Sequence, residues 1–144
     1  MNDMFDLTRF VTAQRPVFSR VMQELKAGRK NSHWMWFVFP QLRGLGHSEM
    51  AERFALSGTA EAQAYLQHSV LGPRLEECVN TLLGHSGLSA LQILGSPDDM
   101  KLRSCLTLFL AAHPRSGVYQ QALDQFYSGA ADGRTLALLQ GGSA

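Results

Sequence analysis

The stretch SHWMWFVFPQ, residues 32–41, decides the fold class, because it fits either a short buried helix or a buried strand. It contains both tryptophans of the chain and two of its eight phenylalanines. Its apolar residues do not alternate with polar ones, as they would in a half-buried strand. Since the patterns on both sides are helical, we expect a short, central helix over residues 33–39 that ends at Pro40.

Outside this stretch the apolar residues recur at helical spacings of three and four. The pattern is clearest in residues 17–25, 75–83 and 102–110. We therefore predict an all-α, compact multihelical single domain of about seven to nine short helices over residues 1–144. Its core is expected to span roughly residues 5–139, with a frayed tail at 141–144.

Short polar residues, prolines and glycines mark where these helices begin and end. Gly28 is predicted to end the second helix, and Gly72-Pro73 to open a later one. The run Ser96-Pro97-Asp98-Asp99 combines a cap, a first-turn proline and two acids, so it predicts the start of a long helix. The remaining predicted N-caps are Asn31 or Ser32, Ser48, Thr59 and Asp132.

The composition excludes several classes of protein but does not indicate a function. With 144 residues, 45% of them hydrophobic and 17% charged, the chain can bury a substantial core. A formal net charge of +1 argues against a disordered chain and against a dedicated nucleic-acid-binding protein. The longest strongly apolar run, residues 34–40, is too short to cross a membrane, and residues 1–10 do not resemble a signal peptide. We expect a cytoplasmic protein.

Cysteines and histidines give no sign of a disulfide framework or a metal centre. Cys78 and Cys105 lie among apolar residues, so we expect free, buried thiols. The five histidines show no metal-ligand spacing, and no Cys-x-x-Cys is present. We therefore predict no metal and no cofactor. The basic group Lys26, Arg29 and Lys30 is expected to lie in solvent at the end of a helix.

The aromatic stretch offers the first candidate site. His33, Trp36 and Gln41 have the stacking and hydrogen-bonding groups that hold a flat heterocycle. His33 is the candidate acid or base, with an ordinary histidine pKa near ~6.5. The alternative is that the stretch simply forms the core of the domain.

The loop that follows offers a second candidate. Two glycines, Gly44 and Gly46, precede a helix capped by Ser48, so the backbone could approach an anion, and Arg43 could add charge-assisted bonds. A plain turn explains the same residues. Gly46-His47-Ser48 also resembles half of a nucleophile elbow, but Met50 stands where its second glycine belongs, so we exclude a serine hydrolase.

The third candidate is the polar side of the helix that begins near Asp98. Lys101, Ser104 and Thr107 follow one another at three-residue spacing, so they share one side of a largely apolar helix. They could contact a ligand together with Asp98. Helix-end electrostatics for Asp98, and hydroxyls that bond to helix carbonyls, are the competing explanation.

Four runs of this sequence together resemble the DUF1810 family of bacterial proteins of unknown function, some of which carry the label calpastatin: residues 32–41, 44–46, 68–75 and 97–104. The resemblance spans roughly residues 5–139 and implies an all-α multihelical fold without an established activity. Calpastatin-type protease inhibitors are long, disordered and repetitive, whereas this chain is short and rich in core residues. The family usually has Ser-Met where Cys105-Leu106 stands here, which argues against a functional Cys105.

Two functions from different classes follow from these observations. The first is binding or hydrolysis of a small anionic, nucleotide-like or ADP-ribose-like molecule. In helical character and length the chain is also similar to the NADAR group of ADP-ribose-processing glycosidases, although no motif matches residue by residue. The second is a non-catalytic protein-interaction module, either a monomer or a homodimer. Neither involves nucleic acid or a membrane.

Overall fold

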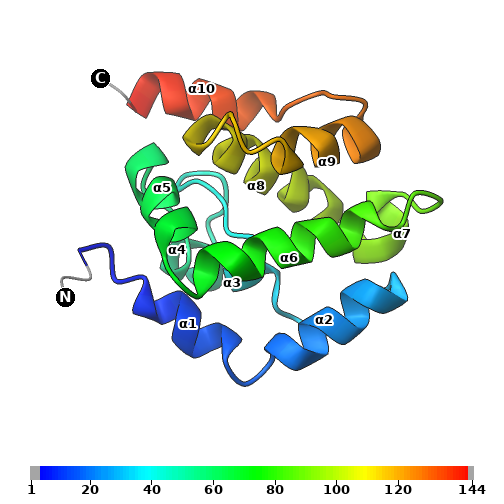
Figure 1. The fold of residues 1–144 in the computed structure, drawn as a ribbon. Coiled ribbons are helices and arrows are strands. Elements are labelled where there is room, and N and C mark those ends of the chain that lie inside the picture. Colours follow the sequence, from blue (N-terminus) through cyan, green and yellow to red (C-terminus); the bar gives the residue numbers. More distant parts are fainter. Residues whose placement is uncertain (1–3, 143–144) are drawn as a thin grey trace.

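The structure, a computed structural model, describes residues 4–142, with side chains as far as Gly141. This part of the chain forms ten helices and no strand, which confirms the all-α prediction and exceeds the predicted number of helices by one (Figure 1). The helices are α1 (Thr8–Gln14), α2 (Phe18–Ala27), α3 (Met35–Val38), α4 (Glu49–Arg53), α5 (Thr59–Gln67), α6 (Leu71–Leu83), α7 (Ala90–Leu94), α8 (Asp98–Ala112), α9 (Val118–Tyr127) and α10 (Gly133–Gly142).

Helix α8 organises the core. It contacts α5, α7, α9 and α10, and Figure 1 shows it passing beneath α10 and beside α9. Six consecutive residues, 104–109, are buried, which is more than one full turn. A helix that is buried on all sides belongs to the interior of a domain. Residues on α8 are therefore held in fixed positions by neighbours from four directions.

The aromatic stretch is helical, but its helix is shorter than predicted. α3 covers Met35–Val38, and neither Asn31 nor Ser32 caps it. The Ser32 hydroxyl instead donates a 2.6 Å hydrogen bond to the Glu24 carboxylate on α2. Trp34 and Phe39 flank α3 and are fully buried. The stretch thus forms part of the core, because α3 packs against α1 and the Trp34 indole bonds to Glu24 on α2.

Three predicted helix ends are confirmed. The Ser48 hydroxyl oxygen accepts a 3.1 Å bond from the Ala51 amide at the start of α4. The Asp132 carboxylate accepts a 2.9 Å bond from the Thr135 amide at the start of α10. Gly28 ends α2 with a φ of 75°, a conformation that residues with a side chain rarely adopt.

Other predicted ends are wrong. Gly58 occupies the N-cap of α5, so Thr59 is its first helical residue. Pro97 takes the N-cap position of α8, and the Ser96 side chain does not cap this helix. Helix α6 begins at Leu71, one residue before Gly72, and Pro73 fits its first turn because the amide that a proline lacks would have no helical partner there. Gly141 and Gly142 belong to α10 rather than to a frayed tail, and residues 143–144 lie outside the described residues.

Both cysteines are free and buried, as predicted. Burial raises the pKa of the Cys78 thiol to about 12. It also raises the pKa of Cys105 well above its usual range. Both thiols are therefore protonated and poorly nucleophilic at neutral pH.

Among the helices of residues 4–142, none has both the length and the hydropathy needed to cross a lipid bilayer.

Candidate functional site

A pocket of about 430 Å³ brings together three segments that are distant in the sequence. One wall is the loop that leads into α4, another is the first half of α8, and the third is the start of α10. Its lining residues are Gln41, Leu45, Gly46, His47, Ser48, Ala51, Pro97, Met100, Lys101, Ser104, Asp132 and Arg134. Parts of the second and third sequence candidates therefore line a single pocket.

Half of the residues predicted for the site line this pocket, namely Gln41, Gly46, Ser48, Lys101 and Ser104. Arg43 and Gly44 line a neighbouring hollow of about 320 Å³, which shares Gly46 and His47 with the pocket. Asp98 lies just behind the wall, in contact with Lys101. His33 and Trp36 are not among the lining residues.

The loop wall is held in place by backbone hydrogen bonds. Leu42 forms an isolated parallel bridge with Leu56. Within it the Leu56 amide donates to the Gln41 carbonyl at 2.9 Å, and the Arg43 amide donates to the Leu56 carbonyl at 2.8 Å. A side chain at Gly46 would bring its Cβ within 2.7 Å of the Ala51 Cβ. Gly46 therefore allows the loop to fold closely over α4.

On the α8 wall, a chain of charges places Lys101 at the pocket. The Lys30 ammonium lies 2.9 Å from Oδ2 of Asp98, and the Lys101 ammonium lies 3.7 Å from Oδ1 of the same carboxylate. The Lys30 side chain is only 8% exposed, so the expectation that it lies in solvent is wrong. Because the two lysines share one carboxylate, the three side chains together keep a positive charge on this wall of the pocket.

Trp36 supports Lys101 rather than lining the pocket. The Lys101 ammonium lies 5.8 Å from the centre of the Trp36 ring, within range of a cation–π interaction. Trp36 itself is half-buried. Stacking of a ligand ring on this face of Trp36 would require Lys101 to move, so the structure offers no open stacking surface there.

His33 is exposed and is not among the residues that line the pocket, and it lies between two residues fixed by other contacts. Its neighbours Ser32 and Trp34 both donate to the Glu24 carboxylate, at 2.6 and 2.9 Å. The histidine that lines the pocket is His47. A proton-transfer role within this pocket would therefore fall to His47.

The α10 wall contributes residues that sequence reasoning missed. The sequence indicates Asp132 only as a helix cap, and no pattern in it points to Arg134. The segment is fixed to α8 by the Thr107 hydroxyl, which accepts a 2.9 Å bond from the Asp132 amide, and by Arg103, which donates to the carbonyls of Ala130 and Ala131. No local pattern predicts this contact, because residues 103 and 131 are brought together only by the tertiary fold.

The hydroxyls on α8 bond to their own helix, as one alternative predicted. Thr107 donates to the Arg103 carbonyl at 2.8 Å, and Ser104 donates to the Met100 carbonyl at 3.3 Å. Ser104 also lines the pocket, and a hydroxyl that donates one bond can still accept another. In the described residues, no group of three or more His, Cys, Asp or Glu side chains is arranged to hold a metal ion.

The charges of the pocket favour an anion. Lys101 and Arg134 lie on two different walls. Asp132 offsets one of these charges, but one of its oxygens accepts both the amide and the hydroxyl of Thr135. The pocket thus combines two cations with polar groups on Gln41, His47 and Ser48, and with apolar surface from Leu45 and Met100.

Comparison with known proteins places this chain in a family. The family described as "Protein of unknown function (DUF1810)" matches residues 4–139. The chain belongs to the DUF1810 family. A crystal structure of another protein, the conserved hypothetical protein Rv1873 from Mycobacterium tuberculosis, is similar to this DUF1810 chain with a TM-score of 0.94 and 54% sequence identity. The alignment covers 96% of this chain and 99% of Rv1873. No curated protein matches the chain.

Membership of DUF1810 confirms the resemblance seen in the sequence, and the similarity to Rv1873 supports the all-α architecture. Neither match names an activity, a ligand or a partner.

Proposed function

We propose that the pocket between the 41–48 loop, α8 and α10 binds a small anionic, nucleotide-like molecule. The observation that carries the proposal is the placement of Lys101 and Arg134 on separate walls of one pocket. Two cations that converge from distant parts of a chain can hold a phosphate from both sides. The volume of about 430 Å³ lies within the usual range for small-molecule sites.

The other groups of the pocket suit the rest of such a molecule. The Gln41 amide offers both a donor and an acceptor, the combination needed to bond to the edge of a base or to a ribose hydroxyl. Leu45 and Met100 provide apolar surface for a flat ring. Met100 is 47% exposed, and its flexible side chain can adjust to a bound ring.

Hydrolysis of the bound molecule would need a group that transfers a proton. In this proposal His47 takes the part first assigned to His33, because His47 is the histidine on the pocket wall. Binding and hydrolysis are separable, so the experiment measures both.

The proposal is tested by calorimetry at low ionic strength with AMP, ADP-ribose and NAD, and with adenosine as the uncharged comparison. Lys101→Gln and Arg134→Gln are each expected to weaken binding of the phosphate-bearing ligands about tenfold, or ~1.4 kcal/mol. Lys26→Gln and Arg115→Gln remove exposed cations outside the pocket and serve as matched controls. Chromatography of the mixtures detects hydrolysis, which His47→Gln should abolish.

Two results would count against the proposal. One is the absence of binding by all three phosphate-bearing ligands at millimolar concentration. The other is an equal loss of affinity in the control variants, because this would indicate attraction to net charge rather than to the pocket.

The alternative function, a protein-interaction module, has weaker support. The large exposed apolar side chains of α7 and α10 are Leu91, Leu136 and Leu138. Figure 1 shows these two helices at different ends of the molecule, so their leucines do not form one continuous patch. Scattered apolar residues are normal on the surface of a monomer. Sedimentation analysis decides between monomer and homodimer.

A further inference from the structure

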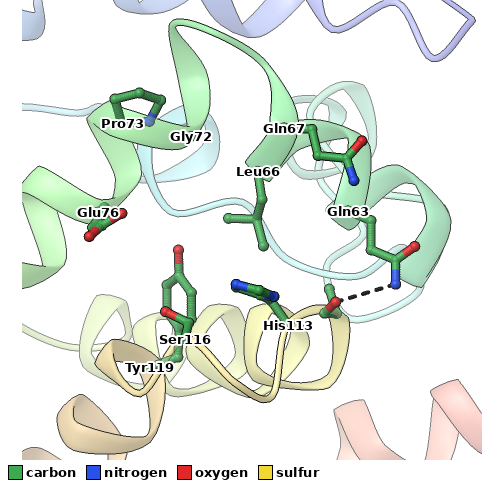
Figure 2. A pocket seen from close by; sticks show the side chains of 10 residues that line it. Gln63, Leu66, Gln67, Gly72, Pro73, Glu76, His113, Ser116 and Tyr119 are labelled. Carbon is green, nitrogen blue, oxygen red and sulfur yellow. Dashed lines mark hydrogen bonds between the residues drawn. The ribbon is translucent and has the colours of Figure 1, made fainter.

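A second cavity, of about 500 Å³, lies between α5, the start of α6 and the connection from α8 to α9. Figure 2 shows the side chains that line it. None of its lining residues belongs to the pocket that contains Lys101. It is therefore a separate feature of the fold, and nothing in the proposed nucleotide site depends on it.

The side chain of Tyr119, which is buried in the core, forms part of the cavity wall. Its side chain is only 2% exposed and packs against Phe109, with the two ring centres 5.9 Å apart. Figure 2 shows its hydroxyl pointing into the cavity, toward the side on which Glu76 and Pro73 lie. Among the described residues this hydroxyl has no hydrogen-bond partner. Because this hydroxyl opens onto the cavity, water or a ligand there can bond to it.

The protonation state of Tyr119 is fixed by its surroundings. Burial raises the pKa of the phenol well above its usual range, with smaller contributions from Cys105 and Glu76. The hydroxyl therefore keeps its proton at every physiological pH and can both donate and accept.

The acidic group of the cavity is at one end. Among the described residues that line the cavity, none is a lysine or arginine, Glu76 is the acid, and His113 lies beside Tyr119 (Figure 2). Arg74 lies nearby on α6 but is turned away, because it donates to Gln14 and stacks over the Phe18 ring at 4.7 Å. The Glu76 carboxylate, at an exposed position on α6, attracts a cation to its end of the cavity.

The remaining groups offer acceptors and apolar surface. The Gln63 side-chain amide donates to the Ala112 carbonyl at 3.3 Å (Figure 2), which leaves its own carbonyl oxygen as an acceptor. Leu66 and Pro73 supply an apolar wall. This arrangement suits a charged ammonium group attached to a short hydrocarbon chain.

We propose that this cavity is a binding site for a small organic cation, a primary amine with a short apolar chain. Its ammonium group pairs with the Glu76 carboxylate and donates to the Tyr119 hydroxyl. Its hydrocarbon part lies against Leu66 and Pro73.

The test compares three probes of equal length that differ in charge: n-butylammonium, n-butanol and butyrate. Each is titrated into the full chain and followed by calorimetry and by the NMR signals of the tyrosine rings. We expect n-butylammonium to bind at millimolar concentration and to shift the Tyr119 signals. Butyrate should not bind, and n-butanol should bind at least about tenfold more weakly, a difference of ~1.4 kcal/mol.

Two variants locate the site. Glu76→Gln should weaken n-butylammonium binding about tenfold, whereas Glu77→Gln, the adjacent exposed glutamate outside the cavity, should leave it unchanged. Tyr119→Phe keeps the packed ring and removes the hydroxyl, so binding should weaken several-fold while the protein stays folded. The proposal is overturned if n-butanol binds as well as the amine, if no probe binds, or if Glu77→Gln has the same effect as Glu76→Gln.

Discussion

The indole Nε1 of Trp34 donates a 2.9 Å hydrogen bond to the carboxylate of Glu24. The same carboxylate accepts from the backbone amides of Asn31 and Ser32, at 2.8 and 3.1 Å, and from the Ser32 hydroxyl at 2.6 Å. One acid on α2 thus fixes the backbone turn and the buried ring with which the aromatic stretch begins. This relationship explains why Trp34 is a structural residue rather than part of a binding site.

Replacement of Glu24 by alanine is expected to destabilise the protein by roughly 3 kcal/mol, because it leaves the buried Trp34 Nε1 without an acceptor and removes bonds to a charged group. Urea denaturation followed by tryptophan fluorescence measures the change. Glu77→Ala, on an exposed part of α6, is the matched control and should change stability by less than about 0.5 kcal/mol. Equal losses in the two variants would contradict the structural role of Glu24.

Acid should weaken this contact in a defined pH range. Burial alone would raise the pKa of Glu24, but the bonds from Ser32, Asn31 and Trp34 outweigh it and lower the pKa from 4.5 to about 2. Because the folded pKa is the lower one, the unfolded chain takes up the proton first. The stability contribution is therefore complete above about pH 5 and is lost as the pH falls through 4.5 towards 2.

The comparison with Glu24→Gln isolates this titration from that of the other acids. The difference in unfolding free energy between wild type and Glu24→Gln should be largest near pH 7 and should shrink between pH 5 and pH 2, the range set by the two pKa values. Urea midpoints at several pH values give this difference. A difference that does not change with pH would be inconsistent with a lowered Glu24 pKa.

Gly72→Ala is expected to destabilise the protein by about 1–3 kcal/mol, although alanine is the better helix former. A Cβ at this position would lie 2.1 Å from the Leu66 carbonyl oxygen, so α5 and α6 would have to separate. Gly133→Ala, in the first turn of α10, places its Cβ in open space and should be neutral or stabilising by up to about 1 kcal/mol. Thermal unfolding of the pair measures the contrast, and a stabilised Gly72→Ala would contradict the packing of α5 on α6.

Local patterns were sufficient to predict most helices. The stripes of α2, α6 and α9 come from spacings of three and four, and the caps at Ser48 and Asp132 depend only on residues within one turn. One end that was predicted wrongly is set by a group from a distant helix. Ser32 does not cap α3, because Glu24 on α2 offers its hydroxyl a charged acceptor.

The candidate site was predictable only in part, because its walls come from segments that are distant in the sequence. The sequence singled out the 41–48 loop and the polar side of α8 as separate features, and the structure brings Gln41, Gly46 and Lys101 to one pocket. Arg134 could not be found, because its place beside α8 depends on the clamp formed by Arg103 and Thr107. The buried position of Lys30 likewise depends on Asp98, which lies 68 positions later in the chain.

Helix α8 forms part of both cavities, with Lys101 near its start and Ala112 at its end. Eleven residues separate these two positions, so the two walls stand about 16 Å apart along the helix axis. That spacing is about twice the distance over which charges act at physiological salt, ~8 Å. A bound anion at one end and a bound cation at the other would neither touch nor attract each other appreciably. Direct charge attraction between two such occupants would therefore contribute little to the affinity of either one.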